Sequence, residues 1–250
     1  MRIWHCITVF LLLCFSAHAQ RFRVVAFYSA DGEMDHINFA NDAVYFFDQL
    51  SVSQKFSFSE TRDWSNLNDK FLANFDIVIW LNDFPKDDEQ RAAFERFVNR
   101  GGAWYGCHVS AFNLPGSEWK WFNTFLGGAY FKTNNWPPAP ARVVVDDRNH
   151  PVTRRLPGSY VSPTGEWYQW QPSPRDNKDV KVLMSIAPES YPLGTKTVIQ
   201  GGDTPVVWTN TKYKMLYMNM GHGNKIFSSE EQNTMITDGL LWLAGAKLLP

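Results

Sequence analysis

The sequence has very few cysteines and no cluster of basic residues. Two of its three cysteines, Cys6 and Cys14, lie within the first 19 residues, so Cys107 stands alone in the remainder. One cysteine cannot form an internal disulfide, and the fold must be held together by its core. Lys and Arg total 24 against 25 Asp and Glu. Without a basic patch or a net positive charge, we expect no binding to nucleic acid or to anionic membranes.

Long apolar runs are also absent, except for one near the amino terminus. Residues 7–15 form a run that follows Met1-Arg2, precedes Ala17-His18-Ala19, and is too short to cross a bilayer. A basic start, a short apolar segment and a small-residue site are typical of a cleaved signal peptide. We therefore predict a signal peptide over residues 1–19 and a mature chain over residues 20–250. The mature protein is expected in the periplasm or outside the cell, without membrane insertion.

The mature segment alternates between apolar runs and helical patterns. Strands are expected near residues 23–28, 56–59, 76–81, 141–145, 180–186, 205–209 and 215–218. Helices are expected near residues 37–50, 87–100, 118–126 and 228–243, and residues 134–140 and 156–163 are predicted as loop and turn. Asp87 and Ser228 are predicted as helix caps. Helices between strands are typical of a parallel sheet, and no linker or repeat indicates a second domain. The pattern predicts one α/β domain with a mostly parallel sheet.

The most informative stretch is residues 101–111, GGAWYGCHVSA, which follows the helix ended by Gly101 and contains a short apolar strand. Gly106, His108 and Ser110 have the spacing of a nucleophile elbow, with histidine in the place of Ser or Cys. A histidine there can be a metal ligand or a general base, or it can be held by loop carbonyls with a purely structural role. Cys107 falls one residue too early for the elbow, and strand alternation favours a place in the core.

Two further histidines follow predicted strands. His222 is flanked by glycines after a late strand, and His36 lies in an acidic loop after the first strand. If their strands are neighbours, His36, His108 and His222 converge and, with a carboxylate, can bind a divalent metal such as zinc or act as acid and base. No H-x-x-x-H or C-x-x-C spacing adds support for a metal, and each histidine can equally be a loop residue. His150 is predicted to have a turn role.

Aromatic residues make up 16% of the chain, and 11 are tryptophans. Trp136 and Trp167 stand in loop-like sequence, followed in the second case by Tyr168. Such side chains can stack on a sugar ring, and we predict them as substrate-binding residues together with His36. The alternative is that these rings fill the core and cover loops.

Several blocks of the chain together resemble the ThuA-like (trehalose utilisation) family. They are GGAWYGCHVSA, EWKWFNTFLGGAYF, DRNHPVTRRLP, GEWYQW and PVVWTNTKYKMLYMNMGH, in this order, with a final helix ending LLWLAGA. The resemblance covers almost the whole mature chain. It implies a flavodoxin-like three-layer α/β sandwich related to class I glutamine amidotransferases.

The resemblance also implies a polar centre formed by the residues at His36, His108, His222 and Glu166. In glutamine amidotransferases a Cys at the elbow works with a His-x-Glu pair, whereas here His108 takes the Cys position and Asn224 the Glu position. This departure argues against amide hydrolysis by a thiolate. Many ThuA-like relatives carry a His after the GGxF block, and here that position is Asn134.

The leading hypothesis is an exported enzyme of carbohydrate catabolism that acts on a disaccharide or keto-sugar. His108, His222 and Glu166 would be catalytic, and His36, His108 and His222 would be the ligands of any metal. One alternative is a non-catalytic sugar-binding module, favoured by the many aromatic residues. Another is an amidase or peptidase that uses Cys107.

Overall fold

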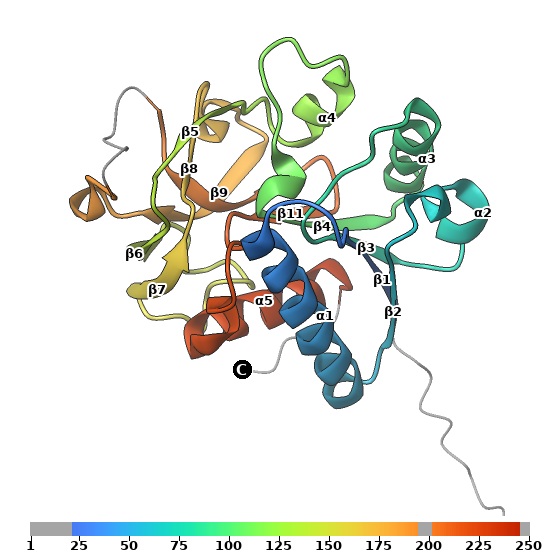
Figure 1. The fold of residues 1–250 in the computed structure, drawn as a ribbon, viewed down its shortest axis with the longest axis horizontal. Coiled ribbons are helices and arrows are strands. Elements are labelled where there is room, and N and C mark those ends of the chain that lie inside the picture. The colour runs from blue at the N-terminus through green and yellow to red at the C-terminus, as the bar shows by residue number, and fades with distance from the viewer. Residues whose placement is uncertain (1–21, 195–201, 246–250) are drawn as a thin grey trace, which may run out of the picture.

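The computed structural model describes residues 22–194 and 202–245, so the predicted signal peptide lies outside the described residues. A nine-stranded sheet runs through the domain in the order β2-β1-β3-β4-β11-β10-β9-β6-β7 (Figure 1). The strands, in that order, are Ser57–Thr61, Arg23–Phe27, Ile77–Trp80, Ala103–Cys107, Met215–Met218, Pro205–Asn210, Val180–Ile186, Ala139–Val145 and Ser159–Gly165. β5 (Phe131–Asn134) and β8 (Tyr168–Trp170) form a separate two-stranded sheet.

The large sheet has a parallel half and an antiparallel half. The parallel half consists of β2, β1, β3, β4 and β11, which pair with one another in parallel in this order. From β11 onward, β10, β9, β6 and β7 pair in antiparallel fashion. Residues 211–214 join β10 to β11, which pair with each other. The change of direction between β11 and β10 divides the sheet into two parts.

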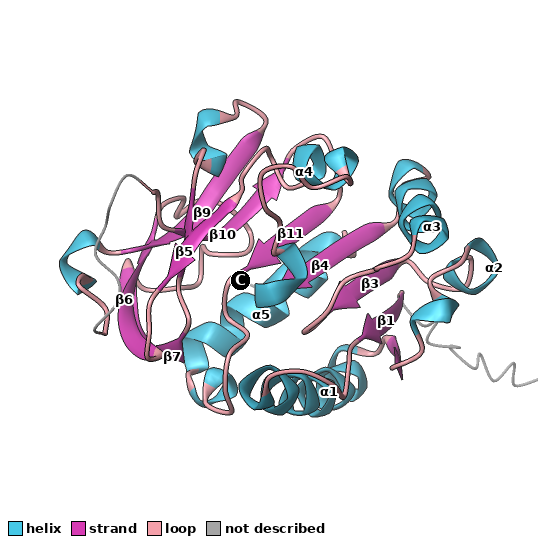
Figure 2. Ribbon diagram, turned by 45° about the horizontal axis from the view of Figure 1, so that its top comes forward, coloured by secondary structure: helices cyan, strands magenta, loops and turns pink. Residues whose placement is uncertain are grey.

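Helices cover both faces of the parallel half, as the views in Figures 1 and 2 show. Side chains of α1 (Met34–Gln54) and α5 (Glu230–Leu243) pack with one set of strand residues, including Val24, Ile79 and Tyr105. Side chains of α3 (Asp88–Asn99) and α4 (Lys120–Phe125) pack on the opposite set, with Val25 and Trp80. The short α2 (Asp69–Leu72) lies on this second face. Because successive strand residues point to opposite faces, the sheet has two separate cores and the fold is a three-layer sandwich.

The helix caps agree with the sequence in one case and differ in the other. Asp87 caps α3, and its carboxylate accepts hydrogen bonds from the backbone N–H groups of Glu89 and Gln90. At α5 the cap is Ser229 rather than Ser228, since the Ser229 hydroxyl accepts the N–H of Gln232. Two adjacent serines offer the same capping group, and a short 3-10 turn over residues 226–228 decides between them.

One turn prediction is wrong. Residues 156–163 were expected as turns, but β7 begins at Ser159 and pairs with β6. β7 lies at the edge of the sheet, where Ser and Pro are tolerated because only one side of the strand joins the ladder. The predicted loop at 134–140 is shorter than expected, since β5 ends at Asn134 and β6 begins at Ala139. In the described part of the chain, no helix combines the length and the apolar character needed to span a membrane.

Candidate functional site

A left-handed turn presents His108 at the carboxyl end of β4. The φ angle of His108 is 46°, a conformation that costs a residue with a side chain about 1–3 kcal/mol. Two glycines accommodate bulky neighbours at this turn. A Cβ atom on Gly221 would lie 2.4 Å from the Cβ of His108, and one on Gly106 would lie 2.0 Å from the ring of Trp104. The elbow-like spacing thus forms a strained strand-to-helix turn.

The structure brings the three predicted histidines together. His36 lies in the first turn of α1 after β1, and His222 lies between two glycines after β11. The ring centroid of His36 is 5.0 Å from that of His108 and 5.0 Å from that of His222, and the last two are 5.6 Å apart. The cluster therefore lies at the carboxyl edge of the parallel strands, where open α/β sheets bind their ligands.

Glu166 joins this cluster from the antiparallel half. Its Oε2 lies 3.3 Å from Nε2 of His108, and its side chain is 12% exposed. The Nδ2 of Asn134 donates a hydrogen bond to Oε1 of the same carboxylate. Asn134, which stands where many relatives have His, therefore contacts the site through Glu166. This bond orients the carboxylate and leaves Oε2 toward His108.

Asn219, at the end of β11, orients His108. Nδ1 of His108 lies 2.9 Å from the backbone carbonyl of Asn219, which accepts its N–H when the proton is on Nδ1, and 3.0 Å from Nδ2 of the same residue. The Tyr217 hydroxyl donates to the backbone carbonyl of His108 at 3.1 Å. The side-chain Oδ1 of Asn219 accepts the N–H of Tyr168 at 3.0 Å. With the proton on Nδ1, Nε2 of His108 carries the lone pair and faces the cluster. A carbonyl behind a histidine in this way is the usual second contact of a metal-binding imidazole.

Two acidic residues at the start of α1, Glu33 and Asp35, contact His222, although the sequence did not mark them as site residues. Glu33 Oε1 lies 3.2 Å from Nε2 of His222, and Asp35 Oδ2 lies 3.7 Å from Nδ1. Glu33 Oε2 is also 3.8 Å from Nε2 of His36. One signal was present in the sequence: Glu33 occupies the N-cap of α1, where Glu is a poor capping residue, and it makes no capping bond. Its carboxylate turns to the histidines instead.

The electrostatics keep two of the imidazoles neutral. Burial, with the neighbouring rings of His108 and His222, lowers the pKa of His36 to about 4. Burial and the nearby His222 lower the pKa of His108 to about 3, although the bond to Asn219 opposes the shift. At neutral pH both side chains are therefore unprotonated. Neutral imidazoles can bind a cation or accept a proton as a general base, but in this state they do not act as general acids.

The donor atoms fit a divalent cation. Two sets of three side chains have ligand atoms that all lie within 4.8 Å of one another: Glu33, His36 and His222, and His36, His108 and Glu166. Buried Nε2 atoms of His36 and His108, and Nδ1 of His222, have no hydrogen-bond partner among the described residues. The predicted ligand set of His36, His108 and His222 is thus divided, because His108 and His222 belong to different sets that share His36. Each set adds a carboxylate, and N/O sets of this kind suit zinc.

The predicted aromatic residues have three different environments. Trp136 is 48% exposed on the loop after β5. Trp167 is fully buried, and its Nε1–H donates to the carbonyl of Ala139 at 2.8 Å. The prediction that Trp167 stacks on a sugar is therefore corrected, since its ring belongs to the core. Tyr168 is 3% exposed and packs on His108, with 4.5 Å between ring centroids, so it supports the histidine from behind.

Cys107 does not belong to the site. Its side chain is fully buried in the core on the α1/α5 face, and burial raises the pKa of its thiol. A thiol that stays protonated is a poor nucleophile. Asn224, at the position of the amidotransferase Glu, is exposed beside His222. The geometry therefore does not support a thiolate amidase. His150 is likewise remote, with its ring against Trp242, in agreement with a structural role.

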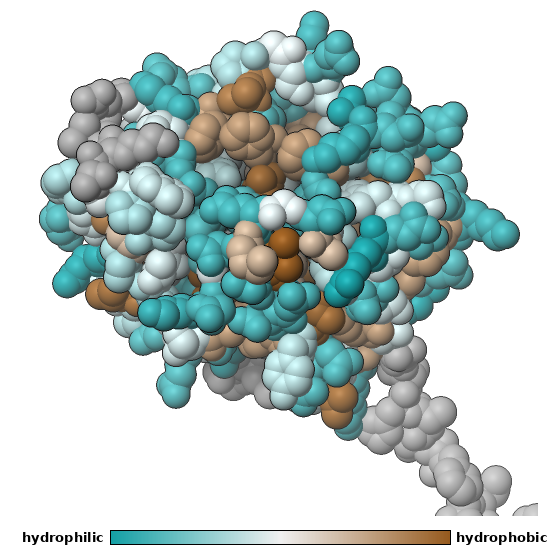
Figure 3. Space-filling model, in the orientation of Figure 1, coloured by the Kyte–Doolittle hydropathy of each residue, from teal (hydrophilic) through white to brown (hydrophobic). Residues whose placement is uncertain are grey.

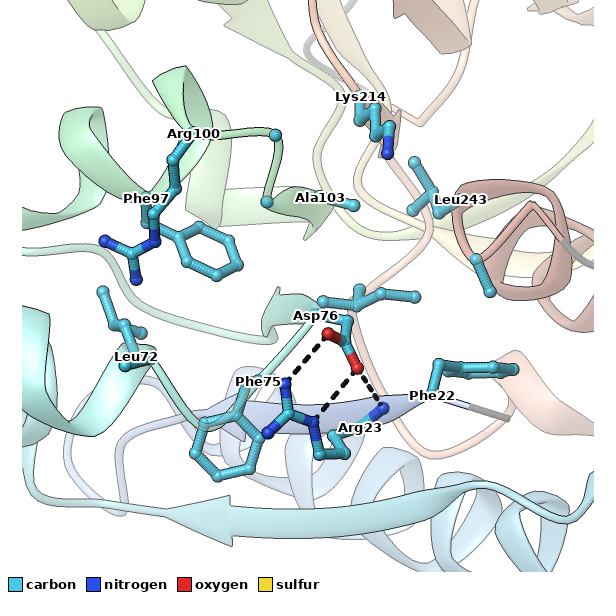
Figure 4. Close-up of a pocket in the computed structure, with 15 residues that line it drawn as sticks. Phe22, Arg23, Leu72, Phe75, Asp76, Phe97, Arg100, Ala103, Lys214 and Leu243 are labelled. Carbon is cyan, nitrogen blue, oxygen red and sulfur yellow. Dashed lines mark hydrogen bonds and ion pairs between the residues drawn. The ribbon is translucent and has the colours of Figure 1, made fainter. Parts of the chain in front are cut away.

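A cavity lies at the edge of the sheet opposite to the histidine cluster (Figure 4). It has a volume of about 460 Å³ and is lined by residues at the amino ends of the parallel strands, among them Arg23, Asp76 and Ala103. Two of these lining residues form an ion pair, with 3.1 Å between Nη2 of Arg23 and Oδ1 of Asp76. The histidines follow the carboxyl ends of the same strands, so this cavity is separate from the cluster. The molecular face in Figure 3 is largely hydrophilic, with apolar residues gathered near its centre.

Comparison with known proteins decides the family. The sequence pattern of ThuA, described as trehalose utilisation, matches residues 23–243. The chain belongs to the ThuA family. The predicted resemblance is thereby confirmed, and membership supports a role in trehalose utilisation in the broad sense. Among curated proteins, none matches this chain.

Solved structures agree with this assignment. A ThuA-like protein from Bacteroides uniformis is 44% identical, with a TM-score of 0.87 over 91% of this chain and 93% of that one. A ThuA-like protein from Parabacteroides merdae is 14% identical, with a TM-score of 0.65 over 92% and 93% of the two chains. The glutaminase domain of Trypanosoma brucei CTPS is 11% identical, with a TM-score of 0.59 over 91% and 96%. The last two show the fold alone, and they confirm the glutamine amidotransferase-like, flavodoxin-like sandwich.

Proposed function

We propose that this ThuA protein is an enzyme that carries out acid–base chemistry on a disaccharide or keto-sugar, assisted by a divalent cation. The single observation that carries the proposal is the convergence of His36, His108 and His222 with unpaired ring nitrogens at the carboxyl edge of the sheet. Buried polar atoms without partners are costly, and they are commonly retained where they bind or react. A role limited to stability does not explain three of them in one place.

Of the two possible ligand sets, we favour His36, His108 and Glu166 for the cation. The ring of His108 is held by the Asn219 carbonyl, and Glu166 is held by Asn134, so both ligands are oriented in advance. His222 instead has Nε2 within 3.2 Å of Glu33, an arrangement suited to proton transfer. A bound cation would polarise a sugar oxygen. His222 with Glu33 would then exchange a proton with the substrate.

We further propose that the protein is exported and that its partner is a small carbohydrate. The amino-terminal sequence supports export. The family description supports a sugar substrate. Intact-mass measurement of the protein recovered from cells tests the first point, because cleavage after Ala19 gives a chain that begins at Gln20.

The cation is tested by elemental analysis of the purified protein. We expect a near-stoichiometric divalent metal in the wild type, and at least a tenfold lower content in His108→Ala and Glu166→Gln. His150→Asn is the matched control, because it removes a histidine that lies against Trp242 and outside the cluster, and it should retain the metal. Equal metal content in all four proteins would contradict the proposed ligands.

The reaction is tested by incubating the loaded protein with trehalose, maltose, cellobiose and their keto derivatives, followed by NMR of the sugars. We expect conversion of at least one compound by the wild type and loss of conversion in His222→Gln, which should still bind metal. Saturable sugar binding without any conversion, unchanged in His108→Ala and His222→Gln, would favour a non-catalytic sugar-binding module.

A further inference from the structure

A small polar cavity lies beside the histidine cluster. It has a volume of about 120 Å³ and is lined by Asp35, Thr164, His222, Gly223, Asn224 and Lys225. A hydrogen bond from the backbone N–H of Gly223 to the carbonyl of Asp35, 3.0 Å long, fastens two of its walls together. The cavity is thus formed where the first turn of α1 and the end of β7 meet the segment after β11.

One polar atom without a partner lies at this cavity. His222 is 1% exposed, and its Nδ1 has no hydrogen-bond partner among the described residues. The nearest carboxylate oxygen, on Asp35, is 3.7 Å away, and both residues line the cavity. Nε2 of the same ring is engaged with Glu33, so the two nitrogens face different surroundings. A ligand group in the cavity would supply the partner that Nδ1 lacks.

We propose that this cavity is a substrate subsite that binds two adjacent hydroxyl groups of a neutral sugar next to the reacting centre. The inference rests on the proposed function, which supplies the sugar. The cavity, with a volume of about 120 Å³, has room for a small polar group such as the two hydroxyls of a vicinal diol. The remainder of the sugar would extend toward the cluster.

The chemistry of the lining fits hydroxyl groups. Hydroxyls both donate and accept hydrogen bonds. The carboxylate of Asp35 can accept from them, the ammonium of Lys225 can donate to them, and Nδ1 of His222 can accept while Nε2–H donates to Glu33. One negative and one positive side chain leave no net charge for an acidic group. The subsite therefore selects a neutral sugar over a uronic acid.

The test uses amide NMR of the full protein titrated with trehalose, maltose, cellobiose and glucuronate. We expect a neutral disaccharide to shift the signals of Gly223, Asn224 and Lys225 together with those of the His108 turn. Glucuronate should bind more weakly. Asp35→Asn and Lys225→Gln should each raise the Kd by about tenfold or more, as expected for hydrogen bonds to charged groups. Lys178→Gln, an exposed lysine outside the cavity, is the control and should leave the Kd unchanged.

The outcomes separate this inference from the proposed function. If a sugar shifts the His108 turn but not residues 223–225, or if Asp35→Asn and Lys225→Gln bind it like the control, the subsite is wrong and the sugar site stands. Tighter binding of glucuronate would also overturn it. If none of the sugars shifts either segment while metal is retained, the sugar assignment fails and the subsite with it.

Discussion

The missing side chain of Gly221 leaves the space that His108 occupies. A Cβ atom at position 221 would lie 2.4 Å from the Cβ of His108 and 3.4 Å from the ring of Phe39. The segment after β11 and the turn after β4 therefore touch through backbone and Cβ. Because His108 has a left-handed backbone, it cannot easily move to relieve a contact.

This relationship predicts the effect of Gly221→Ala. The added methyl group must displace His108, and we expect a loss of about 1–3 kcal/mol in the free energy of unfolding, as for other overpacked sites. Urea denaturation measures it. Gly158→Ala is the control, because its Cβ would lie 3.5 Å from Arg148, an ordinary contact, and the change should stay within about 0.5 kcal/mol. Equal effects at the two positions would contradict the close approach.

Acid should destabilise the metal-free protein through His36. Its pKa in the folded state is about 4, below the unfolded value of about 6.5. The unfolded chain therefore binds the extra proton, so stability is complete above pH 6.5 and falls as the pH drops toward 4. His36→Asn should reduce the slope of the free energy of unfolding against pH by about 1.4 kcal/mol per pH unit between the two pKa values. Urea titrations in EDTA measure the slope, and Lys178→Gln should leave it unchanged.

Cys107 should be chemically inert in the folded protein. It is fully buried and its thiol pKa is raised, so little thiolate is accessible. We expect no alkylation by iodoacetamide in the time that fully labels the urea-unfolded mature protein, measured by mass spectrometry. Rapid labelling of the native protein, with protection by a substrate, would revive the amidase hypothesis.

Trp167 and Trp136 should respond in opposite ways to truncation. Trp167→Ala removes a fully buried ring and should cost about 3–5 kcal/mol of stability. Trp136→Ala removes a half-exposed ring and should change stability by less than about 1 kcal/mol, while weakening binding of any sugar that stacks there. Thermal unfolding and sugar titration separate the two effects. A stable Trp167→Ala with weakened binding would restore the original prediction for that ring.

The sequence was sufficient for the parallel half of the fold. Ile77–Trp80 is continuously apolar because it is buried on both faces, and Asp87 marks the start of α3 in a pattern that does not depend on the rest of the chain. β7 was missed because Ser159 and Ser162 are turn formers by local preference. Their strand conformation comes from pairing with β6 at the sheet edge, which local preference does not encode.

The site was predictable where chemistry coincides with a local signal. His222 is flanked by glycines and His108 follows Gly106 in an elbow-like spacing, and the space left by Gly221 holds the Cβ of His108. Asn219 gave no such signal, because its backbone carbonyl and side-chain amide reach His108 only through the pairing of β11 with β4, which local sequence does not reveal. Trp167 was misplaced because a loop-like sequence does not reveal whether the loop is covered.

The change from parallel to antiparallel pairing at β11 has a consequence for how this site can diversify. His36, His108 and His222 belong to the parallel half, which rests on two helical layers. Asn134 ends β5 of the small sheet, and Glu166 and Trp136 lie in the segments next to β8 and β5. The histidines and Glu166 thus come from two distinct parts of the fold, which meet at the candidate site. Replacing β5, β8 and the segments next to them would change the surroundings of the three histidines and leave the turn that presents His108 intact.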